Sequence, residues 1–463
     1  MYSRINFGIG TLMSLLILAG LCRGADSPAG YGPARVVGTA SPLATCDDPE
    51  MAVSRLQADR LNRQQRDPVH SPPAEGGKTF TAEQFTRKTI YHSPQKPGYT
   101  CWVGAWIAAD KSLMVAFDQA TGPLEGRPRA AKEVLDANPW LAKEPQRDFT
   151  GLKLANVYLR STDGATWDTV AEAAFSGPFD RPVYSQSHVG LADGAILRAV
   201  DGSGLPLDPD LPRRVFFQRS QDLGKTWGKP EIPPEPKRPV EGFIGDYGDC
   251  ITRVRRLRDG QLCAIGSRVR DVFQARTFKP NTNEAFIMLS KDEGKTWAAH
   301  LFGEEYLRPG AFNEWDAAEL PNGDLFCVFR RSDPKTGKPV RWQGLLKKKE
   351  KTWVLEDFRP AALEHSGHPE LLATREGVIL HIATEGIHWT DDVGKTWTPV
   401  IFPGLAKRFR PPTAPESLRT RYYPKSVQTE DGTIYVFAHN GWDNAYGAFD
   451  QSIVMDKFRL TKK

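Results

Sequence analysis

Ser290-Lys-Asp-Glu-Gly-Lys-Thr-Trp297 is the stretch that decides the fold, because its pattern returns along the chain. Residues 220–227 and 390–397 keep the form Ser/Thr-x-Asp-x-Gly-x-Thr-Trp. A copy at 161–167 is one residue short, and 347–353 keeps only the Lys-Thr-Trp ending. Repetition of this kind is typical of a propeller, a solenoid or another array.

Each residue of the repeated motif has a structural role. The Asp side chain accepts hydrogen bonds from nearby backbone N–H groups and closes a turn. The Gly adopts a backbone conformation that a Cβ atom would disfavour, and the Trp packs the turn against neighbouring strands. We therefore interpret these aspartates as structural rather than catalytic.

A second repeat, an apolar strand, a tight turn and another apolar strand, precedes each Asp motif. Asp-Gly and Asn-Gly between apolar runs are strong signals for a β-hairpin. Lys111 departs from this rule, because it stands where the other copies have Gly. The six turns begin at Asp110, Asp193, Asp259, Asn322, Glu376 and Asp431.

Six such units of about four strands predict an all-β fold, a six-bladed β-propeller of four-stranded antiparallel blades. The last unit is one strand short, and we expect residues 89–92 to complete it. This N-terminal strand would close the ring and remove the free edges. A solenoid or two separate β domains are the alternatives, and the absence of a linker between the repeats argues against both.

The first 24 residues predict a secretory signal peptide, hence a secreted or periplasmic protein. Arg4 precedes an apolar run at 9–22, which is shorter than the roughly 20 residues of a membrane span. Residues 25–85 are rich in Pro and polar side chains, and we expect a partly disordered leader there. The propeller is then expected at 86–463.

The chain has 463 residues and a formal charge of +5. A charge this small for the length argues against nucleic acid as a partner. Of the six cysteines, Cys22 would leave with the signal peptide. The remaining odd number, without Cys-x-x-Cys spacing, predicts neither a metal site nor a disulfide framework, although one bridge stays open. Nothing in the sequence points to a cofactor.

The innermost strand of a propeller blade begins near the central opening, about eight positions before each turn. The side chains there are candidates for a small-molecule site. Glu314, His368 and Tyr423 come from three consecutive blades, so a Tyr nucleophile beside a Glu base is feasible. His188 is a further candidate for substrate binding. The six positions are Trp102, Ser185, Ile251, Glu314, His368 and Tyr423.

These motifs resemble the sialidase (neuraminidase) superfamily, the Asp-box or BNR propellers. Residues 313–330, which open with Asn-Glu and end in Arg, look like the family's Glu strand, and 422–433 look like its Tyr strand. The resemblance implies Tyr423 as nucleophile, Glu314 as its base and Asp148 as acid/base residue. It also implies Arg330 as one of three arginines that bind the sugar carboxylate.

Two of the three arginines of the family are missing. The place of the first reads Thr-Cys-Trp-Val-Gly at 100–104. The third should precede the last Asp motif, but residues 376–407 contain no Arg, and Arg375 is displaced from the expected place. Losing these contacts removes about 1.5–3 kcal/mol for each charged hydrogen bond. Arg268, Arg331, Arg419 and Arg421 are the arginines that remain as substitutes.

The sequence thus predicts a secreted exo-glycoside hydrolase of the sialidase type that acts on a glycan or oligosaccharide. The acidity of the terminal sugar and the oligomeric state stay open. Two alternatives from other classes remain. One is a non-catalytic carbohydrate-binding propeller, and the other is a uronate polysaccharide lyase with a Tyr/His pair on the same scaffold.

Overall fold

The computed structural model describes the chain from residue 78 to residue 463, with internal gaps. The predicted signal peptide at 1–24 and the leader up to residue 77 therefore lie outside the described residues. Within the described part, no helix is both long and apolar enough to cross a membrane. The gaps are at 96–98, 124, 133–134, 136–147, 176–186, 201–215, 232–249, 271–281, 303–313, 333–338, 351, 364–366, 384–385, 405–421 and 441–451.

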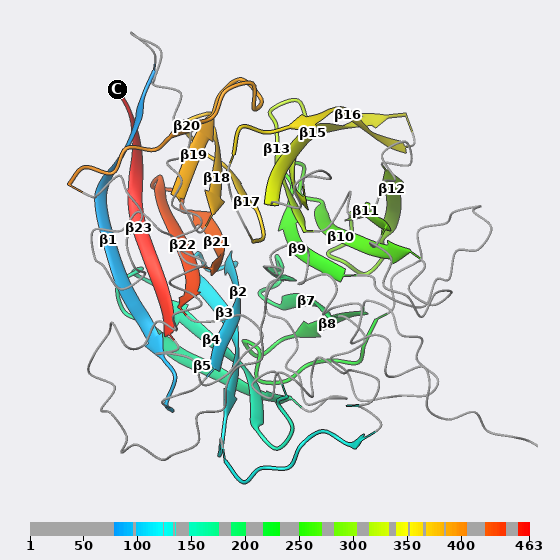
Figure 1. Ribbon diagram of the computed structural model, residues 1–463, viewed down its shortest axis with the longest axis vertical. Coiled ribbons are helices and arrows are strands. Elements are labelled where there is room, and N and C mark those ends of the chain that lie inside the picture. Colours follow the sequence, from blue (N-terminus) through cyan, green and yellow to red (C-terminus); the bar gives the residue numbers. More distant parts are fainter. Residues whose placement is uncertain are drawn as a thin grey trace, which may run out of the picture.

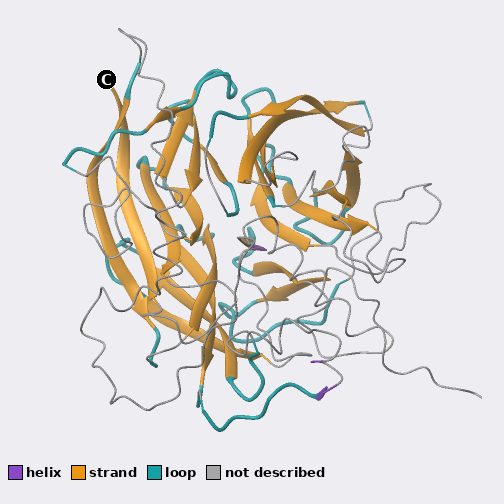
Figure 2. Ribbon diagram, in the orientation of Figure 1, coloured by secondary structure: helices purple, strands orange, loops and turns teal. Residues whose placement is uncertain are grey.

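Six antiparallel sheets form the blades of a propeller, as the sequence predicted, and strands dominate the drawing (Figures 1 and 2). In blades I to V the innermost strand comes first along the chain, and the next strands lie progressively outward. In the sixth blade the outermost strand is instead the N-terminal strand β1. Blade I contains β2 (Tyr99–Ile107), β3 (Leu113–Thr121), β4 (Lys153–Ser161) and β5 (Asp168–Phe175). Blade II contains β6 (His188–Gly190), β7 (Ile196–Val200) and β8 (Phe216–Ser220). Blade III contains β9 (Cys250–Arg256), β10 (Leu262–Arg270), β11 (Thr282–Ser290) and β12 (Ala298–Phe302).

The second half of the chain forms three more blades in the same way. The inner strands β2, β9, β13, β17 and β21 surround the centre in Figure 1, and neighbouring inner strands contact one another. Blade IV contains β13 (Trp315–Glu319), β14 (Leu325–Ser332), β15 (Pro339–Lys349) and β16 (Thr352–Pro360). Blade V contains β17 (Glu370–Ala373), β18 (Ile379–Ala383), β19 (Gly386–Thr390) and β20 (Thr398–Pro399). Blade VI contains β21 (Tyr422–Gln428), β22 (Thr433–Asn440), β23 (Ser452–Lys462) and β1 (Phe80–His92).

Blade II differs from the expected four strands. It has three strands among the described residues, and a single antiparallel bridge between Phe217 and Glu231 occupies the place of the fourth. The backbone N–H groups of both residues donate to the partner's carbonyl, at 2.8 and 2.7 Å. The described part of this blade's outer edge is therefore paired at one position, and that of blade V, through β20, at two.

The N-terminal strand closes the ring, as predicted. β1 pairs antiparallel with β23, and in Figure 1 the blue and red strands run side by side. The strand begins at Phe80, so residues 80–85 belong to the propeller and not to the leader, where the sequence analysis placed them. Arg87 donates two hydrogen bonds to the Asp456 carboxylate, at 2.6 and 2.7 Å, and ties the two strands together.

The tight turns lie where the repeats predicted them. Lys111 adopts a left-handed backbone with a φ of 69°, close to the 80–88° of the glycines at the same position in the other five turns. The departure from Gly therefore leaves the turn geometry intact and places the strain of a left-handed conformation on a lysine.

The Asp motifs form the expected hydrogen-bonded turns. In blade III the Asp292 carboxylate accepts from the Thr296 backbone N–H at 2.8 Å and from its hydroxyl at 2.6 Å. The Gly294 N–H donates to the Ser290 hydroxyl at 2.7 Å. Trp297 then stacks on Phe217 of blade II, with ring centroids 4.3 Å apart. The motif therefore fixes a blade to the preceding one, which explains why it recurs.

Candidate functional site

Tyr423, Glu314 and Arg330 meet in the buried centre of the propeller. The Tyr423 hydroxyl donates to Glu314 Oε1 at 2.9 Å, and Arg330 Nη1 donates to Glu314 Oε2 at 2.7 Å. The same Nη1 atom lies 3.2 Å from the Tyr423 hydroxyl oxygen. The three side chains come from β21, from the residue before β13 and from β14, and the sequence analysis had selected all three. A Tyr hydroxyl beside an ionisable carboxylate can lose its proton to it.

Two irregular strands aim aromatic side chains at this centre. Tyr423 has a φ of 47° and Trp102 a φ of 56°, and each lies at an irregularity in strand pairing at the start of its inner strand. The two rings contact edge to face, with centroids 4.7 Å apart. Bulges and left-handed non-glycine residues are both enriched at functional sites, because they redirect a side chain at an energetic cost. The packed surroundings of Tyr423 hold this conformation in place.

His368 lies beside Tyr423, with ring centroids 6.2 Å apart. It is 2% exposed, and neither ring nitrogen has a hydrogen-bond partner in the part of the protein that the structure describes. The backbone of Pro369 lies near the ring and raises the pKa of His368, but the contact does not have the geometry of a hydrogen bond. Burial and then the nearby Lys425 lower the pKa of His368 well below its usual value. The imidazole is therefore neutral and offers one donor and one acceptor to a ligand.

Asp148 precedes β4 and is held by several donors. Its carboxylate accepts from Arg129 Nε at 2.7 Å and from the backbone N–H groups of Ala130 and Thr150, at 3.0 and 3.1 Å. Burial alone would raise the pKa of Asp148, but the hydrogen bonds from Ala130, Arg129 and Thr150 lower it. The next residue, Phe149, packs in one cluster with Trp102 and Tyr423. Asp148 therefore lies on a segment next to the centre, with its carboxylate kept ionised.

His188 lies apart from the Tyr423 pair, in an aromatic cluster between blades I and II. Its ring stacks on Trp106, and its Nε2 atom is 3.1 Å from the Tyr158 hydroxyl. These contacts make it a packed, hydrogen-bonded residue within the blade interface. Of the four substitute arginines, Arg331 stacks on Trp342 with its guanidinium carbon 4.3 Å from the ring centroid. The side chain of Arg268 and both Arg419 and Arg421 lie outside the described residues.

Beneath the Tyr423 pair lies a group of charged residues that the sequence analysis did not select. Glu370 of β17 accepts from Arg253 of β9 at 3.1 Å, and its other oxygen accepts from the Ser426 N–H and hydroxyl, both at 2.8 Å. Lys425 Nζ lies 3.5 Å from Glu370. We call the set of Arg253, Arg255, Asp316, Glu370 and Lys425 the channel charge cluster.

The channel charge cluster spans four blades. Arg255 Nη2 lies 2.8 Å from each Asp316 oxygen, and Asp316 also accepts from the Leu371 N–H at 2.7 Å. Asp316, Glu370 and Lys425 have no exposed side-chain surface. Burial lowers the pKa of Lys425, whereas Arg253 and Lys425 outweigh the effect of burial on Glu370 and lower its pKa. A signal for this cluster existed, since three of its members follow Glu314, His368 and Tyr423 by two positions.

Cysteine chemistry offers little at this site. Cys263 and Cys327 are buried free thiols, and Cys101 is buried as well. Cys101 Sγ lies 3.5 Å from His439 Nε2, on β22, and the His439 ring is 6.3 Å from that of Tyr423. Burial raises the pKa of Cys263 to about 12, so its thiol stays protonated. Among the described residues no group of His, Cys, Asp and Glu side chains has the arrangement of a metal site.

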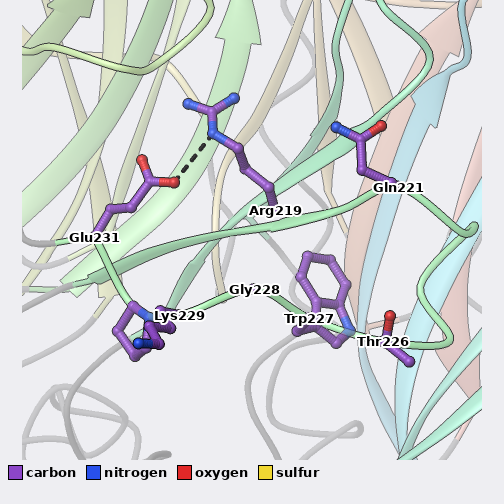
Figure 3. Close-up of a pocket in the computed structure, with 8 residues that line it drawn as sticks. Arg219, Gln221, Thr226, Trp227, Gly228, Lys229 and Glu231 are labelled. Atoms are coloured by element: carbon purple, nitrogen blue, oxygen red, sulfur yellow. Dashed lines mark hydrogen bonds and ion pairs between the residues drawn. The ribbon is translucent and has the colours of Figure 1, made fainter.

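A separate depression lies over the Asp motif of blade II (Figure 3). It is open, and Arg219 Nε donates to Glu231 Oε1 at 3.2 Å across it. Trp227 and Thr226 of the motif form part of its wall. It shares no residue with the Tyr423 pair and contains no nucleophile beside a base, so we do not regard it as the reaction site.

No protein-family model matches the chain, and a search of curated protein sequences finds no match. Solved structures do match. A protein of unknown function from Dyadobacter fermentans has 15% identity and a TM-score of 0.54, covering 82% of this chain and 99% of its own. An α-L-arabinofuranosidase variant from Fusarium graminearum, bound to an iminosugar inhibitor, has 11% identity and a TM-score of 0.51, covering 81% and 98%.

An α-L-arabinanase from Penicillium chrysogenum, complexed with arabinobiose, is similar to the same extent. It has 14% identity and a TM-score of 0.50, and the match covers 81% of this chain and 98% of the other. Identities this low show a shared fold and leave the chemistry to be argued from the residues. This chain and the similar proteins therefore share the propeller along nearly the whole length of each neighbour.

Proposed function

We propose that the protein is a glycoside hydrolase that removes a terminal sugar from a glycan, with Tyr423 as nucleophile and Glu314 as its base. The observation that carries the proposal is the hydrogen bond of 2.9 Å from the Tyr423 hydroxyl to Glu314. Two of the structural neighbours are named as an arabinofuranosidase and an arabinanase, which supports a carbohydrate substrate. The predicted signal peptide places this activity outside the cytoplasm.

The reaction would proceed by two displacements. Glu314 takes the hydroxyl proton of Tyr423, and the phenolate oxygen forms a bond to the anomeric carbon. The bond from that carbon to the leaving oxygen breaks, and the leaving oxygen takes a proton from an acid. Water then displaces the tyrosine from the sugar, and the tyrosine recovers its proton. A neutral nucleophile of this kind replaces the second carboxylate of most glycosidases.

Arg330 has two roles in this proposal. It donates to Glu314 at 2.7 Å and lies 3.2 Å from the Tyr423 hydroxyl, so it holds the pair in register. It is also the residue that would contact the sugar, as the resemblance implies. Because Arg330 is engaged with Glu314 and two family arginines are missing, we expect weaker dependence on a sugar carboxylate than a full arginine triad would give.

His368 would bind the sugar beside Tyr423. Its two buried ring nitrogens have no partner among the described residues, and a ligand hydroxyl group would supply one. We expect His368→Phe to raise KM more than His368→Gln, because glutamine keeps a donor and an acceptor. Equal effects of the two variants on KM would remove His368 from the binding site.

The first test is release of product from a panel of fluorogenic glycosides, including arabinofuranosides, sialic acid and uronic acids. We expect release by the wild type and a loss of at least about 10³-fold in Tyr423→Phe, since removing a nucleophile leaves only binding and electrostatic contributions. Equal release by both proteins would show that Tyr423 is not the nucleophile. No release by a folded wild type, together with binding on a glycan array, would favour the non-catalytic binding propeller.

Asp148 is our candidate for the acid that protonates the leaving oxygen. If it has this role, Asp148→Asn should slow cleavage of a glycoside with a poor leaving group much more than one with a good leaving group. Its bonds to Arg129, Ala130 and Thr150 instead suit a carboxylate that shapes the loop. Equal loss on both substrates would assign it that structural role.

A second candidate function is a lyase, favoured by the neutral His368 beside Tyr423. The imidazole would remove the proton next to a uronate carboxylate, and Tyr423 would protonate the departing oxygen as a carbon–carbon double bond forms. Such a reaction consumes no water and gives an unsaturated product that absorbs in the ultraviolet. Absorbance growing during digestion of a polyuronate would therefore support the lyase over the hydrolase.

A further inference from the structure

The channel charge cluster follows the proposed site along the inner strands with a regular offset. Asp316 follows Glu314, Glu370 follows His368 and Lys425 follows Tyr423, each by two positions. Two positions of chain span at most roughly 7 Å, so the backbone of each charged residue lies within about that distance of a site residue. The channel charge cluster therefore forms a second layer of side chains directly next to the layer of Glu314, His368 and Tyr423.

Within this second layer positively charged side chains outnumber negatively charged ones. Arg253 and Lys425 share one carboxylate, that of Glu370, to which Arg253 donates at 3.1 Å and Lys425 lies at 3.5 Å. Arg255 and Asp316 form a separate pair at 2.8 Å. Three cations face two carboxylates, which leaves one positive charge in excess. The excess belongs to the group of Arg253, Lys425 and Glu370, of which Lys425 lies on the strand that carries Tyr423.

The charges that border each reacting group also differ. The base Glu314 is followed by a carboxylate on β13, Asp316, whereas the nucleophile Tyr423 shares β21 with an ammonium, Lys425. When Glu314 takes the proton, one negative charge moves from the Glu314 carboxylate to the Tyr423 oxygen. A positive group near the tyrosine and a negative group near the glutamate both favour that movement, and burial strengthens their effect.

We propose that the channel charge cluster is a set of positioning residues whose excess positive charge stabilises the phenolate of Tyr423. This inference rests on the function proposed above and adds to it what drives proton transfer from a buried tyrosine. A buried ion group could also serve only to fix the inner strands relative to one another. The two roles differ in one respect, because only the electrostatic one depends on the sign of the charge removed.

Other titratable or charged groups surround the Tyr423 ring and stay unchanged in the test. They come from the residue before β13, from β14, from the residue before β17, from β22 and from β2. These groups are Glu314, Arg330, His368, His439 and Cys101.

The test measures the ionisation of Tyr423 itself and needs no substrate. A fluorinated tyrosine is incorporated at position 423, and its fluorine NMR signal is followed against pH in the full chain. We expect Lys425→Met to move the ionisation midpoint to higher pH by about one unit, the order for one charge at roughly 7 Å in a partly buried site. Glu370→Gln should move it to lower pH, and Lys425→Arg should leave it near the wild-type position.

Shifts of the same sign in Lys425→Met and Glu370→Gln, or no shift in either, would overturn the proposal. Folding is checked by near-ultraviolet circular dichroism. If Lys425→Met fails to fold, the direction of the shift in Glu370→Gln decides. If neither folds, the cluster has only a structural role and the proposal is wrong. Because the readout is independent of turnover, a failure to cleave any glycoside would not obscure the result.

Discussion

Carboxylates at the rim of the propeller and carboxylates in its channel differ in how they are held. Asp292 at the rim is half-buried, and its partner Thr296 lies four positions away. Glu370 in the channel is fully buried, and its partners Arg253, Lys425 and Ser426 lie between 55 and 117 positions away. A rim carboxylate is satisfied by its own turn, whereas a channel carboxylate is satisfied only when separate blades meet.

The comparison shows which charges the protein depends on for its centre. Hydrogen bonds from Thr296 lower the pKa of Asp292 to about 2, so this carboxylate stays ionised through local contacts. Glu370 has its pKa lowered against the effect of burial, by cations from two other blades. The rim charges therefore shape individual turns, and the channel charges join blades III to VI.

The largest effect should come from Glu370→Leu, which leaves Arg253 and Lys425 buried without their shared carboxylate. We expect a loss of roughly 3–5 kcal/mol in the free energy of unfolding, the range for breaking a buried ion pair. Chemical denaturation measures it, with Glu430→Leu at the exposed rim as the control that changes little. A small loss of unfolding free energy in Glu370→Leu would show that the buried carboxylate of the channel contributes no more to stability than an exposed carboxylate at the rim.

An intermediate effect should appear in the pH dependence of the rim. Because the pKa of Asp292 is lowered from 3.8 to about 2 on folding, its carboxylate stabilises the protein above the unfolded value. That contribution disappears as the pH falls from 3.8 towards about 2. The difference in Tm between wild type and Asp292→Asn should therefore shrink over this window, and a difference independent of pH would show that the ionised carboxylate is not what stabilises the turn.

The smallest effect should come from Lys111→Gly. Lys111 pays for a left-handed backbone that glycine adopts freely, so the substitution should stabilise the protein by about 0.5–1 kcal/mol. It also removes an exposed ion pair with Glu430, which contributes little. Gly260→Lys, the reverse change in blade III, is the matched variant and should destabilise. Destabilisation by both would mean that the Lys111 side chain matters more than the turn conformation.

The fold was predictable because its signals are local. The Asp motifs and the six turns are each complete within eight residues, and the structure confirms the propeller they predict and its closure by β1. The turn at Lys111 keeps the same backbone conformation although a lysine replaces the glycine of the other five turns. Blade II has three strands among the described residues, whereas the Asp motif at 220–227, which joins β8 to Glu231, indicated a fourth.

The centre was predictable only in part. Counting back from each turn identified Glu314 and Tyr423, and the family resemblance added Arg330, which the structure joins by hydrogen bonds. The same counting did not reveal that Tyr423 has a left-handed backbone, because strand irregularities depend on neighbouring blades. Counting back from the turns also gave no reason to examine the residues two positions further along. Their charges matter because these side chains are buried, and the sequence does not show that burial.

The closure of the ring by β1 sets the order in which the proposed site can appear during synthesis. Arg87 and Asp456, which join β1 to β23, are 369 positions apart, and Tyr423 lies on another strand of the same blade. A ribosome-bound chain that has emerged only as far as blade V cannot yet contain Tyr423, and its β1 edge is unpaired. Tyr423, the proposed nucleophile, and the strand pair that closes the ring therefore belong to the blade that is completed last.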